Sequence, residues 1–343
     1  MVLSLARRLT RFHATTGALA LSAAVAVVLL VGGWALQPGT RAQEAGAALP
    51  VSEAPAATTG DSAASPPESL STAHLSTGCS NPGVASPSQQ LTSGGLTRTF
   101  RVHAPGSLEQ PAAVVINLHG RYANAEFQER YSGFVPISDR EGFLLVTADG
   151  TGAIRGWSAG ATTGSAVDDV KFLGDLIAYV GRAYCVDTGR VFVAGMSNGA
   201  FMAALAGCKI AEVSGIAMVA GTAGPSTPCR GPLPVIVFHG TADTIVPFKA
   251  GTVRNTMSYP GAAPLMAKWS EHNRCTGTSH DDTGQPVVHL VYEGCAAATE
   301  FVVVYGGGHT WPGAVPVPDL GKTSTEISAA EEIWRFFSAI GGR

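Results

Sequence analysis

The stretch that decides the fold is Arg190-Val191-Phe192-Val193-Ala194-Gly195-Met196-Ser197-Asn198-Gly199-Ala200. Its β-branched and aromatic residues predict a buried strand, and the small residues of Ala200–Gly207 predict a helix. Between the two, Ser197 lies in a Gly-x-Ser-x-Gly turn, where glycine neighbours tolerate a strained backbone that presents the hydroxyl group. The helix N-terminus aims free backbone N–H groups at whatever the serine attacks. We therefore predict that Ser197 is a nucleophile.

The same pattern occurs a second time, as Gly156-Trp157-Ser158-Ala159-Gly160. Chance matches are expected, because 42 of the 343 residues are glycine. No strand-like run precedes this second match and no helical pattern follows it. We interpret Ser158 as a loop serine.

Apolar runs on both sides of Ser197 predict the rest of the sheet. The alternating segment Leu96–Val102 predicts a half-buried strand. Continuous apolar runs predict strands buried on both faces at Ala113–Leu118, Phe143–Val146, Val235–Phe238 and Phe301–Tyr305. Helical periodicity separates them, over Val167–Tyr184 and again, near the end, from Ile327 to Ile340. This alternation predicts an α/β fold with a doubly wound, mainly parallel sheet in a single catalytic domain.

Reactive side chains follow the ends of three of these strands, where function collects in such sheets. Ser197 follows the first, Asp243 follows Val235–Phe238, and His309 follows Phe301–Tyr305. The order serine, acid, histidine is that of an α/β-hydrolase. In this chemistry His309 takes the serine proton as a base, and Asp243 holds the imidazole in the required tautomer. Backbone N–H groups of Arg121 and Asn198 are the predicted donors to the oxyanion.

Other polar residues near these loops have structural interpretations. Asp168 and Asp169 are alternative acids, but they stand at the start of a predicted helix, where acids are favoured as caps. His119 and His239 are expected to shape loops. Three aromatic residues close to the active-site loops are predicted to line the substrate pocket: Tyr122, Trp157 and Trp311.

The N-terminal part of the chain differs in composition from the rest. Arg7, Arg8 and Arg11 precede the apolar segment Ala14–Leu36, so residues 1–42 are predicted to be a cleaved signal peptide or, alternatively, an uncleaved membrane anchor. Residues 43–78 are rich in alanine, serine and proline and predict a disordered linker. The catalytic domain is predicted to span residues 79–343. Both interpretations of the front segment imply export, either as a secreted protein or as one anchored on the outer face of the cytoplasmic membrane.

All six cysteines lie beyond the export segment, and an even number in an exported chain favours disulfides, with fifteen possible connectivities. Locality favours Cys208 with Cys229 and Cys275 with Cys295, which leaves Cys79 for Cys185. The cysteines show no Cys-x-x-Cys spacing, and His280-Asp281-Asp282 is interpreted as a solvated turn, so no metal site is predicted. The net charge of −3, without a basic stripe, argues against a nucleic-acid partner.

A joint set of motifs is more specific than any single one of them. It consists of Leu118-His119-Gly120, Gly156-Trp157-Ser158, Val167-Asp168-Asp169-Val170, Cys185-Val186-Asp187, Gly195-Met196-Ser197-Asn198-Gly199, His239-Gly240-Thr241-Ala242-Asp243 and Gly308-His309-Thr310-Trp311-Pro312-Gly313. From Cys79 to Arg343 the chain resembles the polyhydroxybutyrate depolymerase family of exported esterases, which includes feruloyl and acetylxylan esterases. The resemblance implies an α/β-hydrolase fold, hydrolysis of carboxylic esters and no cofactor. It places the nucleophile, acid and base on Ser197, Asp243 and His309.

The sequence departs from this family in one informative place. Many relatives have small or cysteine-containing sequence after the His-Gly pair, whereas this chain has Arg121, which implies a changed acyl pocket or entrance. The segment after His309 is long enough for one helix, so an added polymer-binding domain is not expected there. The sequence leaves three substrate classes as alternatives: hydroxybutyrate polyesters, soluble esters and plant cell-wall esters. The alternatives are a peptidase or lactone hydrolase on the same fold and, from another class, a tethered binding protein without catalysis.

Overall fold

The computed structural model describes residues 74–341, apart from 81–82, 84–85, 87, 107, 109, 160–166, 254–256 and 282–285. The predicted signal or anchor segment, residues 1–42, and most of the predicted linker lie outside the described residues. Within the described part, no helix combines the length and the apolar character needed to cross a membrane.

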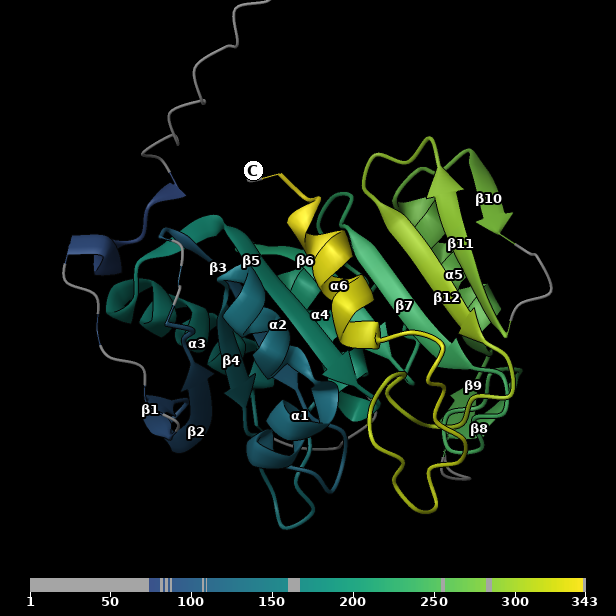
Figure 1. The fold of residues 1–343 in the computed structure, drawn as a ribbon, viewed down its shortest axis with the longest axis horizontal. Coiled ribbons are helices and arrows are strands. Elements are labelled where there is room, and N and C mark those ends of the chain that lie inside the picture. Colours follow the sequence, from purple (N-terminus) through teal and green to yellow (C-terminus); the bar gives the residue numbers. More distant parts are fainter. Residues whose placement is uncertain are drawn as a thin grey trace, which may run out of the picture. The chain divides into compact units, whose positions relative to one another are not determined.

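A single sheet of ten strands organises the domain, in the order β1-β2-β4-β3-β5-β6-β7-β12-β11-β10 (Figure 1). The strands are β1 (Gln89–Ser93), β2 (Leu96–His103), β3 (Ala112–Leu118), β4 (Leu144–Ala148), β5 (Val186–Met196), β6 (Val213–Val219), β7 (Val235–Gly240), β10 (Gly277–Asp281), β11 (Val287–Glu293) and β12 (Thr299–Val304). The six strands from β4 to β12 in the middle of this order are parallel, and the strands at both edges are antiparallel. A separate hairpin pairs β8 (Gly251–Val253) with β9 (Met257–Tyr259).

Helices cover both faces of the sheet, as Figure 1 shows. One face packs against α3 (Asp169–Ala183), α4 (Asn198–Lys209) and α5 (Ala262–His272), and the other against α1 (Ala125–Ser132), α2 (Phe134–Glu141) and α6 (Ala329–Ser338). Side chains of β3 alternate between the two cores, with Val114 and Ile116 in one and Val115 in the other. Because both faces are covered, every residue of β3 is buried. The predicted doubly wound α/β architecture is confirmed.

The terminal helix shows how the sequence sets an element's limits. Ser328 is the N-cap of α6, and its hydroxyl accepts a hydrogen bond from the backbone N–H of Glu331. Trp334 stacks on Phe143, and Phe337 stacks on Phe192 of β5, so the apolar face of α6 lies over the sheet.

Several elements are absent from the sequence-based prediction. Ser214 and Gly215 interrupt the apolar run of β6, so the continuous pattern that marks the other parallel strands is missing there. The antiparallel strands β1 and β11 mix polar and apolar residues because they are partly exposed, and edge strand β10 has no apolar side chain. His280 and Asp281 belong to edge strand β10, so their interpretation as a turn is wrong.

The three disulfides join the pairs that locality favours: Cys79–Cys185, Cys208–Cys229 and Cys275–Cys295. The first of them attaches the segment before β1 to the start of β5. There, Ser76 donates its backbone N–H to the carbonyl of Val186 (3.1 Å) and its hydroxyl to that of Tyr184 (2.8 Å). Residues 74–78 therefore pack on the domain, which corrects the predicted linker boundary at residue 78.

A buried ion pair joins β2 to α3. The guanidinium of Arg98 lies 2.7 Å from the carboxylate of Asp169, both side chains are 1% exposed, and Arg98 also lies over the ring of Phe172. Asp169 accepts a further hydrogen bond from the backbone N–H of Ser158 (2.7 Å). The prediction of a capping role is therefore wrong for Asp169, whereas Asp168 is the N-cap of α3.

We predict that Arg98→Met lowers the free energy of unfolding by about 3 kcal/mol or more, because it leaves the buried carboxylate of Asp169 without its cation. Denaturant unfolding monitored by circular dichroism measures this change. Arg130→Met is the matched control, since Arg130 pairs with Glu126 one turn away on the surface of α1 and should cost less than about 0.5 kcal/mol. Equal losses in the two variants would contradict the assigned role of the buried pair.

Candidate active site

The turn between β5 and α4 holds Ser197 in a strained conformation, with φ 55° and ψ −116°. Two glycines make the turn possible. A Cβ atom on Gly195 would lie 2.3 Å from the carbonyl oxygen of Gly199, and one on Gly199 would lie 2.4 Å from the carbonyl oxygen of Leu118. The backbone N–H of Ser197 is fixed to the carbonyl of Val219 on β6 (2.8 Å). The predicted strand, tight turn and helix are thus present, with the hydroxyl outside the turn.

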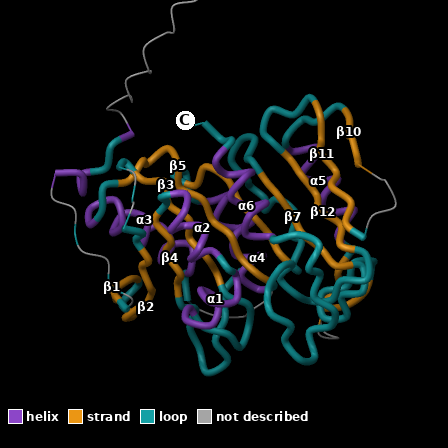
Figure 2. Tube along the Cα trace, in the orientation of Figure 1, coloured by secondary structure: helices purple, strands orange, loops and turns teal. Residues whose placement is uncertain are grey.

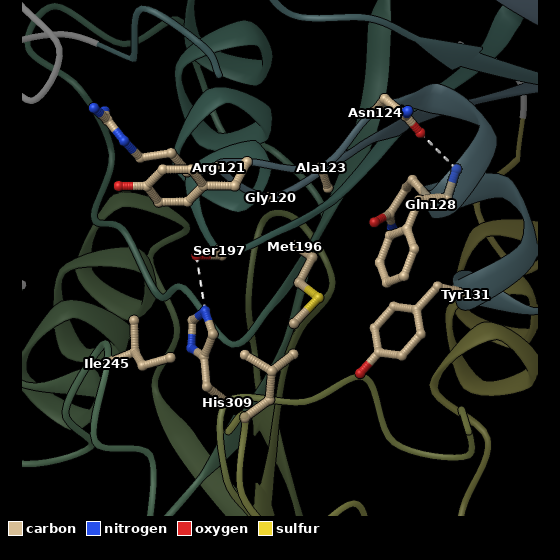
Figure 3. Close-up of a pocket in the computed structure, with 13 residues that line it drawn as sticks. Gly120, Arg121, Ala123, Asn124, Gln128, Tyr131, Met196, Ser197, Ile245 and His309 are labelled. Atoms are coloured by element: carbon tan, nitrogen blue, oxygen red, sulfur yellow. Dashed lines mark hydrogen bonds between the residues drawn. The ribbon is translucent and has the colours of Figure 1, made fainter. Parts of the chain in front are cut away.

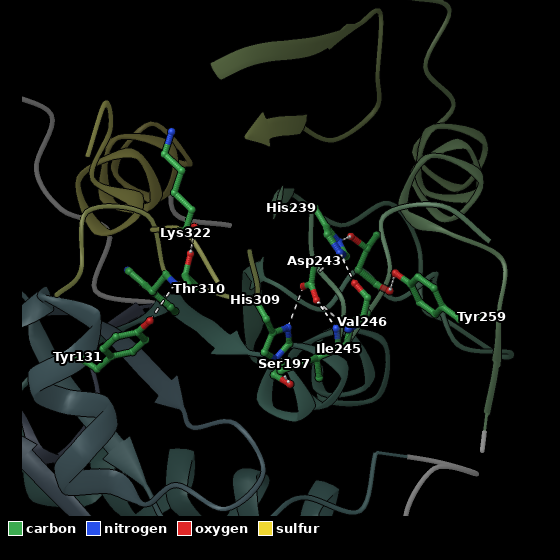
Figure 4. A network of polar contacts seen from close by, with 12 residues as sticks. Tyr131, Ser197, His239, Asp243, Ile245, Val246, Tyr259, His309, Thr310 and Lys322 are labelled. Carbon is green, nitrogen blue, oxygen red and sulfur yellow. Dashed lines mark hydrogen bonds and ion pairs between the residues drawn. The ribbon is translucent and has the colours of Figure 1, made fainter. Parts of the chain in front are cut away.

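Ser197, His309 and Asp243 form one hydrogen-bonded chain (Figure 4). Ser197 Oγ lies 2.9 Å from His309 Nε2, and His309 Nδ1 lies 2.8 Å from Asp243 Oδ2. The three residues come from loops after β5, β12 and β7, all at the carboxyl ends of parallel strands. Figure 2 shows long loops gathered at this end of the sheet. The sequence-based candidates therefore meet at one point.

Backbone hydrogen bonds orient the two members behind the serine. Asp243 Oδ1 accepts from the N–H groups of Ile245 (2.8 Å) and Val246 (2.9 Å), which leaves Oδ2 for the histidine. The backbone N–H of His309 donates to the carbonyl of Leu320 (2.6 Å), which lies in the long loop before α6. With Nδ1–H donated to Asp243, the lone pair on Nε2 faces the serine hydroxyl. This arrangement can remove a proton from Ser197.

The predicted oxyanion donors come from two different loops beside Ser197. Arg121 follows β3, and Asn198 is the first residue of α4. Among the described residues, neither backbone N–H donates to a protein acceptor. The side chain of Asn198 binds the main chain of Trp157, whose N–H donates to Oδ1 (2.6 Å) and whose carbonyl accepts from Nδ2 (3.1 Å). In the same loop, the carbonyl of Arg155 accepts a hydrogen bond from the backbone N–H of Tyr122 (2.9 Å). The loop therefore also holds the Arg121–Tyr122 turn.

No protein-family model matches the chain, but comparisons with known proteins find similar sequences and a similar fold. The chain is 29% identical to feruloyl esterase B of Piromyces equi, over 59% of this chain and 40% of that protein. It is 30% identical to feruloyl esterase C of Emericella nidulans, over 50% of this chain and 58% of that protein. The chain thus spans about half the length of these relatives. The acetyl xylan esterase structure from Aspergillus awamori superposes on 74% of this chain and 99% of its own, with a TM-score of 0.53 and 14% identity.

The chain has the α/β-hydrolase fold and is similar in sequence to the feruloyl esterases.

A cavity of about 490 Å³ opens beside Ser197 in this α/β-hydrolase fold (Figure 3). Ser197, His309, Gly120, Arg121 and Tyr122 contribute to its lining. The sequence-based prediction missed most of its remaining wall, which consists of Ala123, Asn124, Phe127, Gln128, Tyr131, Met196, Ile245 and Leu320. Phe127 and Tyr131 are one helical turn apart on α1, and their rings stack at 5.1 Å. That spacing, directly after the Arg121–Tyr122 turn, is the signal that could have identified them.

Two of the three predicted pocket aromatics lie in the core instead. Trp157 is 1% exposed, stacks on Phe172, and donates its indole N–H to the carbonyl of His119 (2.8 Å). Trp311 is also 1% exposed and packs edge-on against Phe134. The prediction of a pocket role is therefore wrong for both tryptophans, because burial of the large indole rings draws them under the loops. Tyr122 lines the cavity as predicted and is 61% exposed.

The other two candidate histidines brace loops, as the sequence suggests. His119 Nε2 accepts from the N–H of Gly150 (2.9 Å), and its Nδ1 donates to the carbonyl of Gly120 (2.7 Å). His239 Nε2 donates to the carbonyl of Val246 (2.9 Å), and its Nδ1 accepts from Thr222 Oγ1 (2.7 Å). Burial lowers the pKa of each below its usual value of 6.5. Both rings are therefore held neutral, next to the carbonyls that they orient.

We predict that the free energy of unfolding decreases as the pH is lowered below about 6.5. The reason is the lowered pKa of His239: at such pH the unfolded chain binds a proton on this residue that the folded protein does not. His239→Gln removes this titration and keeps a donor for Val246. Between about pH 6.5 and the lower pKa of the folded state, the free energy of unfolding of this variant should depend less steeply on pH than that of the wild type. The difference in slope should be at most that of one bound proton, roughly 1.4 kcal/mol per pH unit. Urea titrations at several pH values measure it, and an unchanged slope would contradict the neutral assignment.

Proposed function

We propose that this protein is a serine esterase that hydrolyses carboxylic esters through an acyl-enzyme intermediate. The observation that carries the proposal is the unbroken hydrogen-bonded chain Ser197–His309–Asp243 at the edge of the 490 Å³ cavity. The relatives named as feruloyl esterases support the same reaction class. Ester hydrolysis needs no cofactor, since nucleophile, base and donors all come from the chain.

The reaction follows from the positions of these groups. Ser197 Oγ attacks the ester carbonyl carbon while His309 Nε2 takes the hydroxyl proton, and Asp243 stabilises the imidazolium. The backbone N–H groups of Asn198 and Arg121 donate to the oxygen that becomes negative. Collapse of the tetrahedral intermediate breaks the bond to the alcohol, which receives the proton from His309. Water then repeats the sequence on the acyl-enzyme, which releases the acid and restores Ser197.

The cavity wall favours substrates with an aromatic or branched apolar group. The aromatic and branched side chains of this wall are Tyr122, Phe127, Tyr131, Ile245 and Leu320. The cavity that they enclose is larger than an acetyl group requires. We therefore place feruloyl-type and other bulky esters before acetylxylan. Polyester chains such as polyhydroxybutyrate remain the alternative substrate, and a peptidase, a lactone hydrolase or a binding protein without catalysis are the competing functions.

We also propose that the protein is exported, with residues 1–42 as a cleaved signal peptide or as an anchor on the outer face of the cytoplasmic membrane. The three disulfides support an oxidising compartment. The N-terminal sequence of the protein recovered from cells distinguishes the two forms, since cleavage after Ala42 leaves Gln43 as the first residue.

We predict that Ser197→Ala removes nearly all hydrolysis of 4-nitrophenyl butyrate, at least about 10³-fold in kcat, because the nucleophile is lost. Release of nitrophenol measures the rate, and circular dichroism should show an unchanged fold.

Ser158→Ala is the matched control, because Ser158 stands in the other Gly-x-Ser-x-Gly match and its hydrogen bond to Asp169 comes from the backbone N–H, which alanine keeps. It should retain wild-type activity. Loss of activity in Ser158→Ala with retention in Ser197→Ala would reverse the assignment. A wild-type protein that cleaves none of the esters, peptides or lactones offered would favour the binding protein.

A further inference from the structure

The cavity beside Ser197 contains an acceptor that the protein itself leaves unused. Gln128 on α1 is fully buried, and its Nε2 donates to Asn117 Oδ1 on β3 (3.1 Å). Its Oε1 has no hydrogen-bond partner among the residues that the structure describes. Gln128 lines the same cavity as Ser197 and His309, and Figure 3 shows its amide oxygen turned toward that cavity.

A chain of hydrogen bonds behind Gln128 fixes which end of the amide faces the cavity. Ser132 Oγ donates to the carbonyl of Glu129 (3.4 Å) and accepts from Asn117 Nδ2 (3.0 Å). Asn117 must then present its oxygen to Gln128, which can meet it only with its NH₂ group. A reversed Gln128 would set two oxygens against each other. The acceptor therefore faces the cavity because of the direction of this chain.

Much of the wall of this cavity is apolar or aromatic. Phe127 and Tyr131 flank Gln128 on α1, and Met196 and Leu320 line the same cavity. Buried polar atoms in native proteins are nearly always hydrogen-bonded, so an unpaired one in a cavity wall points to a ligand that pairs with it. Ligand sites typically combine an apolar lining with a few placed polar groups that confer specificity.

We propose that Gln128 Oε1 accepts a hydrogen bond from a hydroxyl group of the ester substrate and so selects hydroxylated substrates over their deoxy analogues. The proposal rests on the esterase function proposed above. A neutral amide oxygen in an apolar wall suits a neutral hydroxyl donor and disfavours a carboxylate, which would bring a second acceptor. A deoxy analogue leaves the oxygen buried and unpaired, which is how a polar pocket rejects a substrate that lacks the matching donor.

The test compares kcat/KM for esters that differ by one hydroxyl group. For the acyl side the pairs are 4-nitrophenyl 3-hydroxybutyrate with 4-nitrophenyl butyrate, and methyl 4-hydroxycinnamate with methyl cinnamate. For the alcohol side the pair is 2-hydroxyethyl butyrate with ethyl butyrate. We expect the hydroxylated member of at least one pair to be preferred roughly 10-fold, as one neutral hydrogen bond allows. A preference in none of the pairs overturns the proposal, with no variant needed.

Gln128→Met assigns that preference to the side chain, since methionine keeps the length and removes the acceptor. The ratio within the preferred pair should fall to near one, mainly through slower hydrolysis of the hydroxylated ester. Asn117→Ala is a second test, because Asn117 fixes the direction of the Gln128 amide without lining the cavity, so the ratio within the preferred pair should fall in this variant as well.

Loss of fold integrity alone would lower kcat/KM for both members of a pair and leave their ratio unchanged in either variant. An unchanged ratio in a folded Gln128→Met therefore overturns the role of Gln128. If the wild type hydrolyses no ester of any pair, the esterase function fails. If it hydrolyses both members of every pair equally, the esterase function stands and only the hydroxyl selection fails.

Discussion

The close approach of three backbones at the nucleophile turn is the constraint on which the site depends. The carbonyl of Gly199 lies so close to Gly195, and the carbonyl of Leu118 at the end of β3 so close to Gly199, that a Cβ atom on either glycine would overlap with it. Because the turn is this tight, Ser197 is held at a positive φ and its hydroxyl stands clear of the backbone. The N-terminus of α4 then begins directly after the serine, so the N–H of Asn198 stands where negative charge would develop.

The same turn organises the loops around it through Asn198. Its side chain holds the main chain of Trp157, and that loop in turn holds Tyr122 through the carbonyl of Arg155. Asn198 thus carries one of the two proposed oxyanion donors, and its side chain positions the segment that holds the Arg121–Tyr122 turn with the other. On the other side, Asp243 is fixed by two backbone N–H groups and His309 by the carbonyl of Leu320. Main-chain contacts thus preorganise the hydrogen-bonded chain Ser197–His309–Asp243, which limits the reorganisation needed during reaction.

The sequence was sufficient for five of the six parallel strands and for the three polar residues Ser197, Asp243 and His309, because both follow from local patterns; it missed β6, whose apolar run Ser214 and Gly215 interrupt. Val191–Ala194 is continuous and apolar since both faces of β5 are buried, and the order of Ser197, Asp243 and His309 along the chain reflects the order of the strands. The pocket was not predictable in the same way. Trp157 and Phe127 are both aromatic residues in or next to active-site loops, yet Trp157 packs into the core and Phe127 lines the cavity. Which ring is buried depends on the tertiary packing of α3 and α1. Gln128 gives no signal in the sequence, because its partner Asn117 lies on another element.

The most direct measurement of the central claim is the mass of the protein after reaction with a fluorophosphonate, followed by peptide mapping. Such a reagent forms a stable adduct only with a serine whose proton is removed by an adjacent base. The account predicts one adduct per chain, located on Ser197, and its loss when His309 is replaced by alanine. An adduct on Ser158, or one on Ser197 that forms equally fast without His309, would contradict it.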